Sequence, residues 1–206
     1  MKNLKEIWHD LTLTYTSDMG LIDELWNEIE KNYSGKNRHY HNLNHLEFMM
    51  KLAFEYKSEL VDIDTLLFSV FYHDIVYNSK RSDNELKSAE IAKVRLKRLG
   101  LPSDRITKCH EQILATKEHG NDTESDTNFL VDFDLAILGD EHENYLDYTK
   151  KIRKEYSVYP DFFYNKGRKK VLRHFLEMDR IFKTNEFKMN FEEQARKNIR
   201  TELGEE

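Results

Sequence analysis

The sequence has little of what makes tight turns and covalent cross-links. It contains 7 glycines, 2 prolines and 1 cysteine in 206 residues. So few turn residues argue against a sandwich or a barrel, because those folds join many short strands by tight turns. The single thiol, Cys109, cannot form an intrachain disulfide, so nothing indicates an oxidising compartment.

Long apolar runs and an excess of positive charge are missing as well. No run approaches the roughly 20 apolar residues that a membrane span needs, and the first ten residues mix charges into apolar positions, unlike a signal peptide. We therefore expect a cytoplasmic protein with no membrane partner. The net charge of −6 argues against binding a nucleic-acid polymer, although it permits a nucleotide-sized substrate.

What the sequence does contain is helical periodicity over nearly its whole length. Apolar residues return every three or four positions in segments rich in Leu, Glu, Lys and Arg, as amphipathic helices require. A chain of this length can bury a sizeable core, and we find neither a repeat nor a convincing second domain. The prediction is an all-α fold, with one helical domain over residues 1–206.

Several helix boundaries follow from capping residues and from the apolar pattern. Asp62 or Asp64 would cap the helix that runs into His73. A later helix would continue close to His119, and residues 129–139 would form a central helix that is apolar on nearly every side. The helix that starts near residue 83 should turn inward a stripe made of Leu86, Ala89, Ala92 and Leu96.

Acidic side chains occur in two of the most apolar segments. His73 and Asp74 interrupt an apolar run over residues 66–77, and Asp132 and Asp134 are the two charged residues of residues 129–139. Burying a carboxylate without a partner costs several kcal/mol or shifts its pKa until it is neutral. A metal ion is the simplest partner that satisfies an imidazole and a carboxylate together.

The remaining ligands can be sought in RHYHNLNH at residues 38–45, the densest polar-aromatic patch of the chain. With His45, His73-Asp74 and a distant aspartate, the chain has the order H…HD…D. Here it resembles the HD-domain superfamily of metal-dependent phosphohydrolases, most closely the subgroup known as predicted HD phosphohydrolases. The resemblance covers nearly the whole chain, through RHYHNLNH, FYHDIVYN, DNELKSAE, ILATKEH, VDFDLAILG, GRKKVLRHFL and ARKNI.

The resemblance implies a helical bundle whose central helices hold one divalent ion, with His45, His73, Asp74 and Asp134 as ligands. The residues alone leave Asp132 and Asp134 as alternatives, because side chains two positions apart on a helix diverge by about 200°. The family pattern favours Asp134. Two imidazoles and two carboxylates suit Mn²⁺, Fe²⁺, Co²⁺, Ni²⁺ or Zn²⁺, and suit Mg²⁺ less well.

The implied activity is hydrolysis of a phosphoester of a small metabolite such as a nucleotide, by a metal-activated water. Catalytic roles are assigned to Asp74 and Glu85. Some relatives carry an acid three residues after the HD aspartate, where this chain has Tyr77, and Glu85 is the nearest substitute, although it equally suits a helix N-terminus. Substrate contacts are predicted for Arg38, His41, Asn84, His119 and Arg168.

Two other functions stay open. The missing acid at Tyr77 leaves room for a non-catalytic module that keeps the ion to hold a ligand. A di-iron oxygenase, known among HD relatives, would need further histidines. His110 and His119 lie about 180° apart if they share one helix, which argues against a common second site. The oligomeric state is open, and a homo-oligomer is compatible with the sequence.

Overall fold

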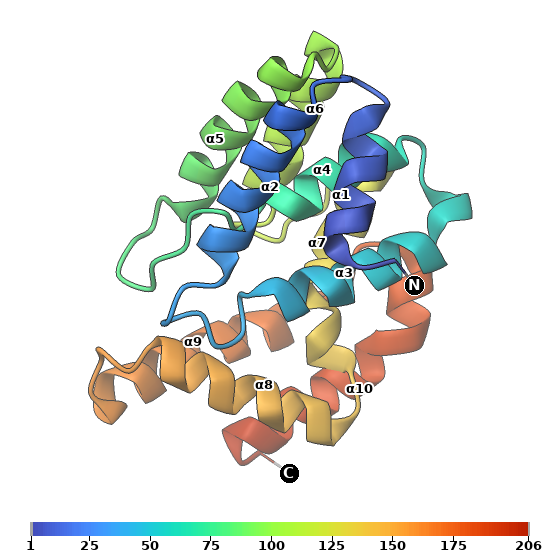
Figure 1. The fold of residues 1–206 in the computed structure, drawn as a ribbon. Coiled ribbons are helices and arrows are strands. Elements are labelled where there is room, and N and C mark those ends of the chain that lie inside the picture. Colours follow the sequence, from blue (N-terminus) through green and yellow to red (C-terminus); the bar gives the residue numbers. More distant parts are fainter. Residues whose placement is uncertain (1, 206) are drawn as a thin grey trace. The chain divides into compact units, whose positions relative to one another are not determined.

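The computed structural model describes residues 2–205, and no strand occurs in that range. Its regular elements are helices (Figure 1), which confirms the predicted all-α fold. The chain divides into two compact units, Met1–Leu130 and Val131–Glu206, and the division falls inside helix α7 (Ser125–Leu135). The single domain expected over residues 1–206 stays a prediction.

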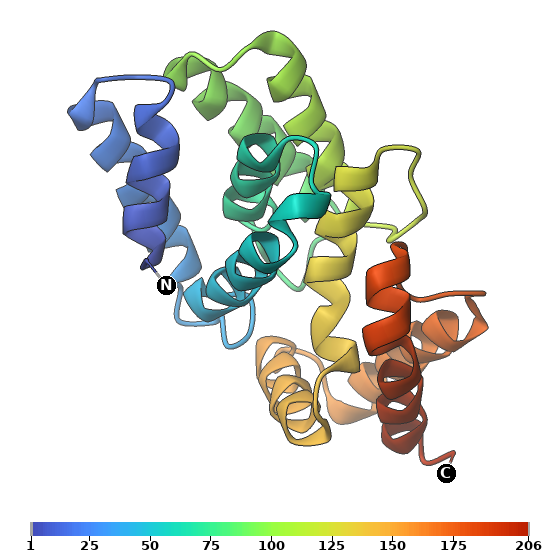
Figure 2. The same ribbon diagram turned by 90° about the vertical axis from the view of Figure 1, so that its right-hand side faces the viewer.

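The first unit is built around a buried helix, α4. Its helices are α1 (Leu4–Leu13), α2 (Met19–Tyr33), α3 (Leu43–Glu55), α4 (Ile63–Tyr72), α5 (Asn84–Leu99) and α6 (Ser103–Ala115), with a short 3-10 turn, η1 (Lys57–Glu59). Every residue of α4 from Thr65 to Tyr72 is buried. Helices α3, α5 and α6 pack against it, and Figure 2 shows the same neighbours from the side. This central helix ends at the predicted site.

The start of α4 is fixed by two carboxylates. Asp62 caps the helix, because its side chain accepts hydrogen bonds from the backbone N–H and the hydroxyl of Thr65 at 3.2 and 2.7 Å. Asp126 accepts from the backbone N–H groups of Val61 and Asp62 at 2.9 and 2.8 Å. Asp64 instead accepts from the Tyr15 hydroxyl. Of the two predicted caps, Asp62 is therefore confirmed.

Two details of the first unit differ from the prediction. Helix α6 ends at Ala115, before His119, because its last turn tightens and the Thr116 hydroxyl donates to the Ile113 carbonyl at 2.8 Å. Leu86 is 49% exposed and does not belong to the inward stripe of α5, whereas Ala89, Ala92 and Leu96 are buried as predicted. The inward positions of the first turns are taken by Asn84 and Ser88, which hold a neighbouring loop.

The second unit contains the 3-10 turn η2 (Ala136–Gly139) and helices α8 (His142–Glu155), α9 (Asp161–Glu177) and α10 (Asn185–Leu203). The helix expected over residues 129–139 begins earlier, at Ser125, and passes into η2 after Leu135. Turn η2 packs on α10, where Asn198 donates to the carbonyls of Leu138 and Asp140 at 3.0 and 2.9 Å. Among residues 2–205, no helix combines the length and apolar composition that crossing a bilayer demands.

Candidate metal centre

Three of the predicted metal ligands come together in the first unit. His45 on α3 and His73-Asp74 at the end of α4 offer ligand atoms that all lie within 4.8 Å of one another. The two Nε2 atoms of His45 and His73 are 3.3 Å apart, and His73 Nε2 is 3.5 Å from Asp74 Oδ2. Both histidines are buried, at 3% and 1% exposure. His45 and His73, which are 28 positions apart in the sequence, thus lie at the same site.

The ends of two helices place these side chains. Asn42 caps α3, accepting a hydrogen bond from the backbone N–H of Asn44 at 2.9 Å, which puts His45 in the first turn. Helix α4 ends at Tyr72, as the prediction of a helix ending at the HD pair requires. The backbone N–H of Asp74 then donates to the Tyr33 hydroxyl at 3.1 Å. Because the helix has ended, two consecutive side chains can converge.

The protonation of His73 follows from its other ring nitrogen. His73 Nδ1 lies 2.9 Å from the carbonyl oxygen of Val70, and a carbonyl can only accept, so Nδ1 carries the proton. In the neutral ring Nε2 then presents a lone pair toward His45 and the Asp74 carboxylate. The C-terminal end of α4 adds negative partial charge at the same place. The two imidazoles and the carboxylate form a buried group that could hold a cation.

The distances also suit one ion. A metal bound at about 2.1 Å to two imidazole nitrogens separates them by about 3.0 Å at a right angle and by about 3.4 Å at the tetrahedral angle. The 3.3 Å between the Nε2 atoms of His45 and His73 lies between these values. A fixed Nδ1–H to carbonyl bond, as His73 has, is also typical of metal-binding histidines.

His41, one of the predicted substrate contacts, lies beside this group. Its Nε2 is 3.9 Å from Asp74 Oδ2, and its ring stacks on Tyr77 with centroids 4.2 Å apart. Tyr77, three residues after Asp74, therefore packs against an imidazole. His41 is half-buried, so its imidazole stands next to the Asp74 carboxylate at an accessible place.

Arg38 has a structural use in this part of the chain. Its guanidinium donates to the carbonyls of His41 and Ile75 at 2.9 and 3.1 Å. It also lies over the rings of Tyr33 and Tyr77, 4.8 and 5.5 Å from their centroids. Arg38 therefore joins the loop before α3 to the segment after Asp74. Contact with substrate stays a prediction for this residue.

Asn84 and Glu85, at the start of α5, differ in their surroundings. Asn84 accepts from the backbone N–H of Asn78 at 3.2 Å and donates to the Asn78 carbonyl at 3.0 Å, so both halves of its amide hold the loop that follows the HD pair. Glu85 is half-buried, and its Oε2 is buried without a hydrogen-bond partner among the described residues. An unsatisfied buried carboxylate oxygen is rare in folded proteins and is consistent with a functional role.

Two predicted substrate residues, His119 and Arg168, belong to other elements. His119 is half-buried in the loop after α6, with φ at 50°, the one non-glycine residue with positive φ in residues 2–205. Arg168 belongs to the second unit, where it makes a bidentate ion pair with Glu202 at 2.9 and 3.0 Å and donates to the Tyr148 hydroxyl at 3.2 Å. This pairing accounts for Arg168 structurally and gives its predicted substrate role no support.

The choice between Asp132 and Asp134 can be examined within the second unit. Asp132 is fully buried and accepts three hydrogen bonds, from the backbone N–H of Lys183 at 2.6 Å and from the N–H and hydroxyl of Thr184, both at 2.7 Å. Burial raises the pKa of its carboxyl to about 6, and these hydrogen bonds oppose the rise. Asp132 therefore anchors the entry to α10. Asp134, half-buried, stays the predicted fourth ligand.

His110 and His119 do not share a helix, because α6 ends at Ala115. The separation of about 180° expected for one continuous helix therefore does not hold for this pair. His110 instead lies 3.1 Å from Glu90 on α5. Neither histidine belongs to the ligand group found in residues 2–205.

Sequence reasoning missed the residues that hold the ligands in place. Tyr33 supports the Asp74 backbone, and the Val70 carbonyl orients His73. Tyr33 stood in a helix interpreted as purely structural, and no motif marked it. A signal could have come from its position immediately before the loop that leads to residues 38–45.

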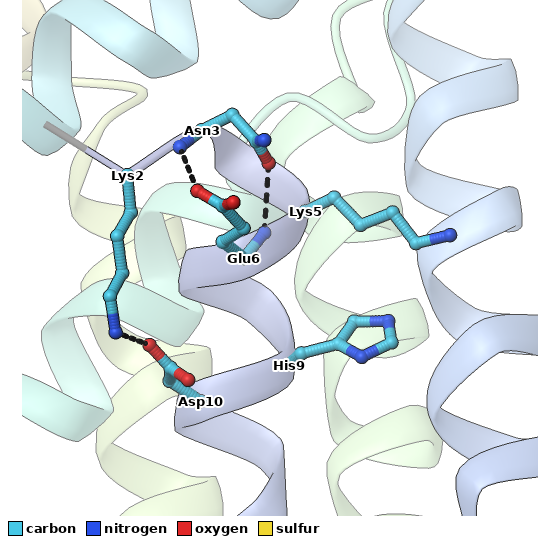
Figure 3. A pocket seen from close by; sticks show the side chains of 6 residues that line it. All are labelled: Lys2, Asn3, Lys5, Glu6, His9 and Asp10. Carbon is cyan, nitrogen blue, oxygen red and sulfur yellow. Dashed lines mark hydrogen bonds and ion pairs between the residues drawn. The ribbon is translucent and has the colours of Figure 1, made fainter.

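A surface hollow on α1 is a second place to consider, and Figure 3 shows its lining. Asn3 and Glu6 cap the helix reciprocally, Lys2 pairs with Asp10, and His9 lies 3.2 Å from Asp23. None of the predicted site residues lines it. Asn3 pairs with Glu6 and Lys2 with Asp10 within the lining itself, so the hollow supports no functional assignment.

Comparison with family models, with curated proteins and with solved structures found no match to this chain.

Proposed function

We propose that this chain is a cytoplasmic, metal-dependent phosphohydrolase that cleaves a phosphoester of a small metabolite such as a nucleotide. The observation that carries the proposal is the convergence of His45, His73 and Asp74. Membership of the HD-domain superfamily is part of the same proposal and is supported by the ordered motifs of the sequence.

The residues present fit a divalent transition-metal ion. Two imidazole nitrogens and a carboxylate oxygen are a donor set typical of Mn²⁺, Fe²⁺, Co²⁺, Ni²⁺ and Zn²⁺, and the resemblance adds Asp134 as fourth ligand. When bound, such an ion supplies a water of lowered pKa and offsets negative charge on a phosphoryl oxygen.

The chain's own groups would complete the reaction. His73 is held in the ligating tautomer by the Val70 carbonyl, and Asp74 is held at its backbone by Tyr33. Glu85, with one carboxylate oxygen unsatisfied, is the candidate to take up or return a proton. His41, beside Asp74, can donate to a phosphate oxygen.

The test loads purified protein with Mn²⁺, Co²⁺ or Ni²⁺ and measures phosphate release over a panel of phosphoesters. His73→Ala should abolish release, and His110→Ala, a histidine outside the ligand group, should retain it. Release that persists in His73→Ala would overturn the assignment.

Metal content separates the remaining alternatives. One ion per chain with no turnover on any phosphoester would favour a non-catalytic binding module, an outcome that the stacked Tyr77 ring in place of an acid leaves open. Two irons per chain with an iron-dependent absorption band would favour an oxygenase. The pairing of His110 with Glu90 weighs against that outcome.

A further inference from the structure

Positive charge is concentrated in one segment of this acidic chain. Residues 150–173 contain nine Lys and Arg and two Asp and Glu, a net charge of +7, whereas the whole chain carries −6 and the remainder therefore −13. The segment forms the end of α8, the turn after it and most of α9, which make a helical hairpin within the second unit (Figure 1).

Helix α9 has one face packed and one face open. Leu172 and Phe175 are buried, and Arg168 is tied to Glu202. At 100° per residue, a group of exposed side chains falls within an arc of about 120° on the other side of the helix. This outer face of α9 consists of Phe162, Phe163, Lys166, Lys169, Lys170 and Arg173, and it ends at Glu177, the exposed last residue of the helix.

The apolar part of the outer face lies at the tip of the hairpin. Phe162 and Phe163 are 74% and 64% exposed, and their rings contact edge to face with centroids 5.5 Å apart. Val158, in the turn just before them, is 49% exposed. Three large apolar side chains in one exposed turn are unusual on a soluble surface and mark an interaction site.

The cations of the outer face are available. Lys166, Lys169 and Lys170 are exposed and take part in no ion pair among residues 2–205. Arg173 makes one contact with Glu205, at 3.4 Å, and its side chain is 60% exposed. A helix with apolar side chains at its tip and cations along the rest of its exposed face is typical of a peripheral membrane anchor.

We propose that the outer face of α9 attaches the protein to an anionic lipid surface, with Val158, Phe162 and Phe163 entering the boundary between headgroups and acyl chains. The lysines behind them would face lipid phosphates and carboxylates. Attachment to a surface needs no spanning helix. It would reverse the expectation that the protein has no membrane partner.

A second copy of the chain is a poor partner for the outer face of α9. A two-fold contact would bring the same lysines of both copies face to face, and their charges would repel. A nucleic acid would match the charge, since bases stack on aromatic rings. However, Val158 offers no stacking surface, and the two Phe rings stand edge to face rather than forming parallel platforms. Hydrocarbon accommodates all three side chains.

The experiment uses the full chain and sedimentation with vesicles of phosphatidylcholine alone or with about one-third phosphatidylserine. Binding should need phosphatidylserine and should weaken as KCl rises. Replacing Lys166, Lys169 and Lys170 by Gln should weaken binding roughly 100-fold, because each cation near such a surface changes affinity about fivefold. Phe162→Ala with Phe163→Ala should weaken it at least tenfold.

Matched controls replace Lys51, Lys57 and Lys93 by Gln, which changes net charge equally, and Met189 by Ala, which removes an apolar side chain that is 78% exposed elsewhere. Both should bind vesicles as the parent does, and circular dichroism should show every variant folded. Three results would each overturn the proposal: no vesicle binding, equal loss in the control lysine variant, or lysine-dependent binding of a single-stranded oligonucleotide in place of vesicles.

Discussion

The Nε2 atoms of His45 and His73 lie 3.3 Å apart in the interior of the first unit, each on a different helix. Two imidazoles this close, one with its Nδ1 proton committed to the Val70 carbonyl, place ring nitrogens where a shared cation would satisfy both.

Metal should stabilise the protein through these two histidines. An ion that binds only the folded state at about 100 times its dissociation constant raises the free energy of unfolding by about 2.7 kcal/mol. We expect the thermal midpoint to rise with added Mn²⁺ or Zn²⁺ in the parent and in His110→Ala. In His45→Ala and His73→Ala the rise should vanish, and a parent that shows none would contradict the metal centre.

Substitution of the two aspartates of α7, Asp132 and Asp134, should affect different properties: the stability of the fold in one case and metal binding in the other. Asp132→Asn puts an amide NH₂ against a backbone N–H of Lys183 or Thr184, and we expect a loss of about 1–3 kcal/mol in urea unfolding. Its affinity for metal, measured by calorimetry, should stay near that of the parent. Asp134→Asn should leave the free energy of unfolding near that of the parent and should weaken metal binding. If Asp132→Asn weakened metal binding and Asp134→Asn did not, Asp132 would be the ligand.

Gly139 should tolerate no side chain. A Cβ added there would lie 2.5 Å from the carbonyl oxygen and 2.7 Å from the Cβ of Phe191 on α10, so η2 and α10 would have to move apart. We expect Gly139→Ala to lower the free energy of unfolding by about 1–3 kcal/mol.

The matched control is Gly167→Ala, inside α9, where an added Cβ meets nothing within 4 Å. Alanine there should stabilise the protein by about 0.5–1 kcal/mol, because glycine loses more backbone entropy in a helix. If urea unfolding showed the same change in the free energy of unfolding for Gly139→Ala and Gly167→Ala, the packing of η2 on α10 would be contradicted.

Cys109 should be unreactive in the folded protein. Burial raises the pKa of its thiol to about 12, although a hydrogen bond with Ser69 opposes the rise. A thiol reagent at pH 8 should modify no cysteine in the native state and one after denaturation. Because the unfolded thiol ionises near its ordinary pKa of about 9, the free energy of unfolding should fall as pH rises above 9. Cys109→Ala should flatten that part of the pH profile.

Local patterns were enough to predict much of this molecule. Asp62 caps α4, and α4 stops at the HD pair as its sequence indicates. These features depend on neighbouring residues, so a local pattern contains them. The prediction failed at Leu86, because packing of Asn84 and Ser88 against a loop, rather than apolar periodicity, decides which side of α5 turns inward.

By itself the sequence determined the all-α class. It singled out His73 and Asp74 because they interrupt an apolar segment, and His45 because it belongs to a polar-aromatic patch and completes the order H…HD…D. Only the tertiary structure decided that these side chains meet, that Tyr33 holds the Asp74 backbone, and that Asp132 and Arg168 are used in structural contacts. The reason is physical: such pairings join positions far apart in sequence, and hydrogen-bond partners at that separation leave no periodic trace.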